Sequence, residues 1–228
     1  MLERLSALIR QTLESANLNV NQARVEPDPA DPDGQSLLLW YPTSTVEGNV
    51  YIRRAIKIES GAKSVLDPYA PVVLKPYIAD DLPNLDLAVG NVTTVDPSRT
   101  FWDKVVILHG LRRWWDRRGE LKGGGQRVSR HYYDVYRLLA SQKGREASGD
   151  MEMAEDCVRH ARMFFNRPDL DLASAIFGSF ALTPHDGMLA DLRRDYVAMS
   201  GMVFDPIPTV DEIVAAISKL ERRLNVRI

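Results

Sequence analysis

Two stretches decide the fold of this chain: Arg99-Thr100-Phe101-Trp102-Asp103-Lys104-Val105-Val106-Ile107-Leu108-His109 and Ser129-Arg130-His131-Tyr132-Tyr133-Asp134-Val135-Tyr136-Arg137-Leu138-Leu139. Apolar residues recur in both at helical spacing, so each is predicted to form a helix with one apolar side. Each apolar side also carries a group that a hydrophobic core rejects, Lys104 in the first and Asp134 in the second. Buried charges without partners are costly, so such groups normally find partners or do chemistry.

The pattern of each helix leaves the role of its charged residue open. Lys104 either extends along apolar surface toward water or points into a cleft. Asp134 either forms a surface ion pair with Arg130 or Arg137 of its own helix, or lies with His131 beside a substrate.

A basic and aromatic segment, Arg112–Arg118, follows the first helix, and Lys122 and three glycines come after it. Arginines bind phosphates and tryptophans stack on bases, so RNA contacts are expected here. The alternative is a helix end whose arginines complement the helix dipole. The glycines are not a phosphate-binding loop, because no strand precedes them and no Gly-Lys-Ser/Thr follows. The candidate RNA-binding residues are Arg112, Arg113, Arg117, Arg118 and Arg127.

After a first helix, the chain up to residue 97 favours strands, and the chain from residue 98 onward favours helices. Strands are predicted at 36–41 and 49–60 as an antiparallel hairpin, and at 72–78 and 87–95; residues 26–34 are predicted to be an exposed loop. Helices are predicted at 2–17, 98–116, 130–142, 150–165, 170–177, 186–201 and 209–224. This order predicts an α+β protein with a sheet region over 1–97 and a helical region over 98–228. The linker near Asp96-Pro97 is short, so both regions can form one unit.

Alternation in Tyr51–Glu59 separates two faces of a strand. Ile52, Ile56 and Ile58 are expected on a dry face. Lys57 and Glu59 share the other face, which is either a solvated ladder of charges or the wall of a cleft. In the cleft, Glu59 could hold a divalent metal such as Mg²⁺.

Composition excludes few functions. The chain has 228 residues, of which 45% are hydrophobic and 26% charged, with a net charge of −2. Nucleic-acid binding would therefore need a local basic patch. No apolar run approaches the ~20 residues of a membrane span. A lone Cys157 and the absence of a signal sequence fit a cytoplasmic protein.

Taken together, these segments resemble the AbiEii/AbiGii toxin family of nucleotidyltransferases. Ile56–Glu59 with Gly61–Ser64 resembles the family's Lys-x-acid strand and the turn after it. Arg99–His109 resembles the helix with the family's essential lysine, and Ser129–Leu138 resembles its last motif. The family's helical tail is resembled by His160–Phe165, Leu192–Met199, Met202–Phe204 and Asp211–Ile213.

The resemblance implies a partial nucleotidyltransferase-type antiparallel sheet and transfer of a nucleotide from an NTP to an acceptor such as tRNA or other RNA. It implies catalytic roles for Glu59, Lys104 and Asp134, converging on one cleft. Lys104 would neutralise the triphosphate, and Asp134 would orient Lys104 or the attacking hydroxyl. Glu59 would bind Mg²⁺, with Lys57, Arg130 and His131 at the nucleotide. An AbiEi-like antitoxin is the implied partner; the oligomeric state is left open.

One departure affects the expected activity. The family's first motif, a Gly-Gly/Ser helix start followed by Asp-x-Asp on a strand, supplies metal carboxylates and is not found here. In relatives it precedes a helix like residues 2–17, so the chain is expected to begin just after it. Either the N-terminus is truncated or the protein is a degenerate, non-catalytic member that still binds nucleotide or RNA. With Glu59 alone as a metal ligand, weak nucleotide binding and poor transfer are expected.

Overall fold

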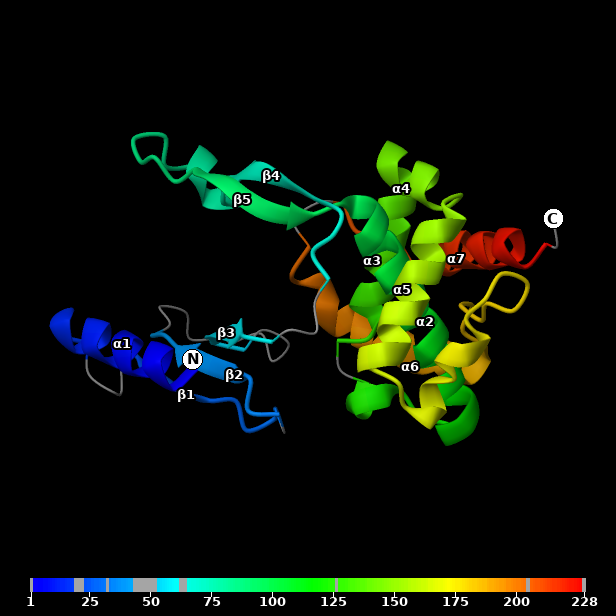
Figure 1. Cartoon of the computed structure of the whole chain (residues 1–228), viewed down its shortest axis with the longest axis horizontal. Coiled ribbons are helices and arrows are strands. Elements are labelled where there is room, and N and C mark those ends of the chain that lie inside the picture. Colours follow the sequence, from blue (N-terminus) through cyan, green and yellow to red (C-terminus); the bar gives the residue numbers. More distant parts are fainter. Residues whose placement is uncertain are drawn as a thin grey trace. The chain divides into compact units, whose positions relative to one another are not determined.

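The computed structural model describes residues 2–18, 23–31, 33–42, 53–61, 65–125, 127–203 and 206–226, in two compact units, Met1–Ser64 and Val65–Ile228 (Figure 1). The first unit holds a helix and three strands, and the second holds a two-stranded ribbon followed by helices. The predicted α+β class with a helical C-terminal region is confirmed. The division into regions 1–97 and 98–228 stays a prediction. Among the described residues, no helix is long and apolar enough to cross a membrane.

The first unit is a small antiparallel sheet packed against one helix. Helix α1 (Leu2–Ser15) precedes strands β1 (Arg24–Pro27), β2 (Ser36–Trp40) and β3 (Ala55–Glu59), in the order β1-β2-β3. The predicted pairing of the second and third of these strands is confirmed, with Ser36 opposite Glu59 and Trp40 opposite Ala55. Leu37 and Leu38 of the central strand are buried and form the core of this unit.

Several details of this unit differ from the sequence predictions. Strand β3 begins at Ala55, and the part of the predicted strand before Arg53 lies outside the described residues. The predicted dry face is wrong at Ile56, which is 55% exposed, because β3 is an edge strand that α1 does not contact closely. Strand β1 was not predicted, since four residues ending in a proline give little signal.

The predicted exposed loop at 26–34 is wrong at Asp28. Its N–H donates to the Ser36 carbonyl at 3.0 Å, which extends the pairing of β1 with β2 by one residue. Asp28 is consequently buried, with 5% of its surface exposed. The sequence did not reveal this pairing, because the surrounding prolines and aspartates are typical of an exposed loop.

The second unit begins with strands β4 (Tyr69–Leu74) and β5 (Val89–Val95), joined through the 3₁₀ turn η1 (Tyr77–Asp80). Four helices then follow: α2 (Pro97–Arg118), α3 (Ser129–Ala140), α4 (Gln142–Ala147) and α5 (Met151–Phe164). Short 3₁₀ turns η2 (Lys122–Gly125), η3 (Pro168–Leu170) and η4 (Leu172–Ser174) interrupt the chain. Helices α6 (Asp186–Ser200) and α7 (Val210–Asn225) complete the unit.

Helix α2 is the centre of the second unit, because α3, α4, α5 and η3 all pack against it (Figure 1). Phe101, Trp102, Val105 and Leu108 are fully buried along its length. The Trp102 indole N–H donates to the Ala147 carbonyl at 2.8 Å and so ties α2 to the end of α4. Asp96 caps the start of α2, and burial of this apolar stripe supplies most of its stability.

Three predictions for the second unit are wrong in detail. Residues 170–177 form 3₁₀ turns instead of a helix, because Asp171 adopts a left-handed backbone with φ of 44°. The strand predicted at 72–78 ends at Leu74, since Pro76 starts the η1 turn. Helix α4 was not predicted; its Gly144 lies so close to the Leu138 carbonyl that an added Cβ would come within 1.9 Å of the oxygen.

The start of α3 is held by a residue distant in sequence. The Asp195 carboxylate of α6 accepts hydrogen bonds from the Arg127 N–H at 2.7 Å, the Ser129 N–H at 2.7 Å and the Ser129 hydroxyl at 2.6 Å. Asp195 is 7% exposed, so these donors lie largely out of water. Asp195 therefore fixes both the loop before α3 and the first turn of that helix.

Replacing Asp195 should destabilise the second unit. Asp195→Ala leaves buried donors without an acceptor, and we expect the free energy of unfolding to fall by roughly 3 kcal/mol. Urea unfolding followed by circular dichroism measures this. Asp211→Ala is the matched control, because Asp211 pairs with Arg193 on the surface and its side chain is 70% exposed. Equal losses in the two variants would contradict the capping role.

Candidate functional site

Lys104 of α2 and Asp134 of α3 form an ion pair across the interface between the two helices. The Lys104 ammonium lies 2.7 Å from Asp134 Oδ2, with side chains that are 24% and 37% exposed. Lys104 therefore points to a charged partner on the neighbouring helix. Asp134 pairs with a residue of another helix, and not only with arginines of its own. The two residues that the sequence singled out do lie together.

His131 completes this group, one helical turn before Asp134. Its Nδ1 lies 3.3 Å from the Lys104 ammonium. Burial, together with the charges of Lys104, Arg130 and Lys122, lowers the pKa of His131 to about 3. The imidazole is neutral at physiological pH, so Nδ1 accepts from Lys104 and Nε2–H remains a donor. The group thus offers one ammonium, one carboxylate and one neutral N–H donor.

In the first unit, Lys57 and Glu59 share one face of β3, as predicted. The Lys57 ammonium lies 2.8 Å from Glu59 Oε1 and 3.3 Å from Asp28 Oδ2. Arg53 lies 3.5 Å from the same aspartate. The Ala30 N–H and the neighbouring cations hold the pKa of Asp28 below its usual range. The two carboxylates raise the pKa of Lys57.

The described residues do not fit a metal ion in this arrangement. The Asp28 side chain is 2% exposed and already bonded to two cations, and Glu59 is bonded to Lys57. Within the described ranges, no group of three or more His, Cys, Asp and Glu side chains is placed to hold a metal ion. A lysine ammonium lies between the two carboxylates where a cation would otherwise be needed.

Glu59 and Lys57 belong to the first unit, and Lys104, His131 and Asp134 belong to the second. The convergence of Glu59 with Lys104 and Asp134 on one cleft stays a prediction.

The arginines near the end of α2 have acidic partners within the second unit. Arg112 and Arg113 pair with Asp116, at 2.9 Å and 3.7 Å. Further along, Arg117 lies 3.9 Å from Asp171, and Arg118 lies 2.5 Å from Asp169. The pairs of Arg117 and Arg118 fasten α2 to the segment after α5, whereas those with Asp116 lie within α2. Much of the positive charge expected for RNA is thereby offset, and RNA binding by these residues stays a prediction.

The loop from α2 to α3 is shaped by its glycines. Gly123, Gly124 and Gly125 have φ values of 68°, 72° and 77°, a left-handed backbone that glycine adopts without strain. The tract is therefore a turn that requires glycine. Arg127 follows, and its N–H is held by Asp195.

Sequence reasoning missed two acidic residues that matter for these groups. Asp28 joins the Lys57 and Glu59 face because β1 extends to it, and the alternation of Glu26 and Asp28 was the available signal. Asp195 reaches α3 from α6, and no local pattern reveals a capping residue that is 66 positions away from Ser129.

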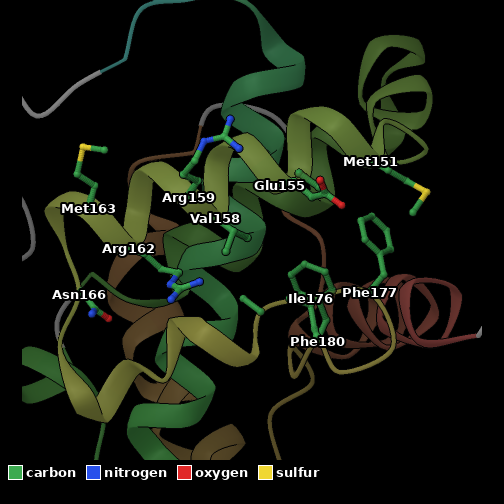
Figure 2. Close-up of a pocket in the computed structure, with 12 residues that line it drawn as sticks. Met151, Glu155, Val158, Arg159, Arg162, Met163, Asn166, Ile176, Phe177 and Phe180 are labelled. Atoms are coloured by element: carbon green, nitrogen blue, oxygen red, sulfur yellow. The ribbon is translucent and has the colours of Figure 1, made fainter.

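A separate pocket of about 750 Å³ lies between α5 and residues 175–180 (Figure 2). Its walls are largely apolar, with Val158, Phe177 and Phe180 among them, and Arg159 and Arg162 come from the α5 side. None of the candidate site residues named above lines it.

The comparisons with known proteins agree with the motif resemblance. The family described as "AbiEii: Nucleotidyl transferase AbiEii toxin, Type IV TA system" matches residues 1–216. The chain belongs to this family of nucleotidyltransferase toxins, which implies a nucleotide substrate and an antitoxin partner. Such enzymes generally use a divalent metal. Searches of curated proteins and of solved structures find no significant match.

The neutral state of His131 predicts how stability depends on pH. An unfolded histidine has a pKa near 6.5, whereas burial lowers the pKa of His131 to about 3. Between these values the unfolded chain binds a proton that the native chain excludes. The contribution of neutral His131 to the free energy of unfolding is therefore fully present above about pH 6.5, and it is lost as the pH falls toward 3.

Thermal unfolding at pH 7.5 and pH 5 tests this. We expect the wild-type melting temperature to fall over this range and that of His131→Gln to fall less, because one protonation is removed. Buried His109, whose pKa is lowered to about 4, accounts for part of the remaining fall. Identical pH dependence in the wild type and His131→Gln would contradict a neutral His131.

Proposed function

We propose that this protein transfers a nucleotide from an NTP to an RNA acceptor, such as tRNA, as the toxin of a type IV toxin–antitoxin system. The observation that supports this most strongly is the Lys104–Asp134 pair, at 2.7 Å, in the two family motifs of α2 and α3. An ammonium that is partly withdrawn from water binds phosphate oxygens strongly. The proposed partner is an AbiEi-like antitoxin.

The roles of the residues follow from their chemistry. Lys104 neutralises negative charge on the triphosphate, and Asp134 holds the ammonium in place until the phosphate arrives. The neutral His131 donates a hydrogen bond through Nε2–H to a phosphate or ribose oxygen. Arg130, exposed on the same turn, supplies further positive charge. Charge neutralisation and positioning are the main contributions a protein makes to this class of reaction.

Lys57 and Glu59 of the first unit are proposed to act at the same nucleotide. We propose that Lys57 and Glu59 complete the nucleotide site, and that Mg²⁺ is required for transfer. Glu59 and Asp28 are already paired with cations, so these carboxylates do not fit a bound metal as they stand. Arg112, Arg113, Arg117, Arg118 and Arg127 are proposed to contact the RNA backbone.

A second candidate function is nucleotide or RNA binding without transfer. It is favoured by the ion pairs that occupy Asp28 and Glu59, since transfer needs carboxylates that are free to coordinate metal. Under this candidate, the chain binds nucleotide or RNA and does not label RNA.

Incubation with labelled NTPs, Mg²⁺ and total tRNA, followed by a denaturing gel, separates the two candidates. If the chain transfers nucleotide, Lys104→Ala and Asp134→Ala should each lower the rate by about a hundredfold, because charge stabilisation at the phosphates is lost. Chelation of the metal should abolish transfer.

Lys219→Ala, an exposed lysine of α7, is the control and should keep the wild-type rate. Nucleotide binding without labelled RNA would favour the second candidate. Robust transfer that survives both Lys104→Ala and Asp134→Ala would contradict the proposed site.

A further inference from the structure

Two adjoining pockets form one groove along α5. The larger, of about 750 Å³, is the pocket between α5 and residues 175–180 (Figure 2). The smaller, of about 530 Å³, is lined by residues from the end of α4 and the end of α7. Met151 and Phe177 line both pockets, so the two are continuous. Together they are called here the α5 groove.

Helix α5 presents one stripe of side chains to this groove. The stripe recurs at helical spacing and consists of Met151, Glu155, Val158 and Arg162. Part of its apolar surface remains in water, since Met151 is 42% exposed and Met163, at the flank, is 70% exposed. Methionine side chains are flexible and polarisable, so they adapt to the shape of a partner. The α5 wall is therefore suited to an apolar occupant.

The opposite wall is held in place by the end of α7. The Gly178 N–H donates to the Leu224 carbonyl at 3.0 Å. The Asn225 side chain accepts from the Phe180 N–H at 2.9 Å and donates to the Phe180 carbonyl at 2.7 Å. The rings of Phe177 and Phe180 lie edge to face, with centroids 5.7 Å apart, and both point toward α5 (Figure 2). A wall that is already formed lowers the entropy that binding costs.

The rim of the groove is positively charged. In the described part of the chain, the side chains of Arg162 and Arg223 have no ion pair or hydrogen bond. Arg145 and Arg159 also line the groove, and each donates a hydrogen bond within the protein. Among the described residues that line either pocket, Glu155 is the one acidic side chain. Charge complementarity therefore favours an acidic occupant.

The walls favour a protein segment over a nucleic acid or a small molecule. Bases stack on exposed aromatic faces, whereas the most exposed apolar side chains of the groove are Met151, Met163 and Ile176. Phe180 is only 2% exposed. The two pockets together are larger than the ~300–1,000 Å³ of a typical small-molecule site. A helix with an apolar stripe matches a groove of this length and composition.

We propose that the α5 groove binds an amphipathic helix of a partner protein. The apolar stripe of that helix packs against Ile176 and Phe177. Asp or Glu side chains beside the stripe pair with Arg162 and Arg223. None of the residues proposed to act in nucleotide transfer lines the groove, so this inference is independent of the proposed function.

Selection from a phage-displayed library of helical peptides against the full chain tests the chemistry of the occupant. The peptides have about 16 residues, enough for about four helical turns. We expect the enriched peptides to combine apolar residues at helical spacing with an excess of Asp and Glu. The affinity of synthetic copies, measured by fluorescence anisotropy, should fall by about tenfold in Ile176→Glu and by about fivefold in Arg162→Glu.

Two variants on α6 serve as matched controls. Val197→Glu places the same charge at an apolar residue that is 73% exposed and outside the groove. Arg194→Glu reverses a surface arginine whose side chain is 76% exposed. Both should bind the peptides within about twofold of the wild type. Ile176 is 58% exposed, so Ile176→Glu should keep the wild-type melting temperature; if it does not, Met163→Glu should show the same loss of binding.

Three results would overturn the proposal. One is enrichment of basic peptides, or of no peptide whose binding depends on Ile176 or Met163. Another is a wild-type dimer, seen by sedimentation velocity, that Ile176→Glu dissociates, because a second copy would then cover the groove. The third is binding of a labelled oligouridylate that weakens in both Ile176→Glu and Arg162→Glu, which would assign the groove to RNA.

Discussion

The ion pair between Lys104 and Asp134 is the constraint on which the second unit depends. Helix α2 is buried by helices on several sides, so a lysine in its middle is tolerated only with a partner. Asp134 supplies that partner at 2.7 Å, and it can do so only if α3 packs in one register against α2. Asp195 of α6 secures this register by holding the start of α3. The fold therefore holds Lys104, the proposed phosphate-binding lysine, against its carboxylate partner.

In the first unit, by contrast, the charged side chains on the sheet are paired with one another. On its sheet, Lys57 lies between Asp28 and Glu59, and Arg53 also pairs with Asp28, so each carboxylate is neutralised from within. In the second unit, Lys122, Arg130 and Arg167 retain positive charge that no described carboxylate offsets. We therefore expect the phosphates of a ligand to bind to the second unit.

The sequence predicted what depends on local pattern. The apolar periodicity of α2 and α3 located both helices, and the misfit of Lys104 and Asp134 on their apolar sides singled out both residues. That Asp134 acts on Lys104 was implied by the family resemblance and not by the pattern. Contacts between distant segments could not be predicted in this way. Asp28 looked like part of an exposed loop because its partners, Arg53 and Lys57, follow about 25 residues or more later. Arg117 and Arg118 looked free because Asp169 and Asp171 follow about fifty residues later. The helix predicted at 170–177 failed because the left-handed backbone at Asp171 has no reliable sequence signal.

The central claim is that Lys104 binds the phosphates of a nucleotide. The most direct measurement is the affinity of the wild type and of Lys104→Met for ATP and for adenosine, by isothermal titration with and without Mg²⁺. Loss of one charge-assisted hydrogen bond should weaken ATP binding by about tenfold and leave adenosine binding unchanged. Equal affinity of the two proteins for ATP, or an equal loss for ATP and adenosine, would contradict the account.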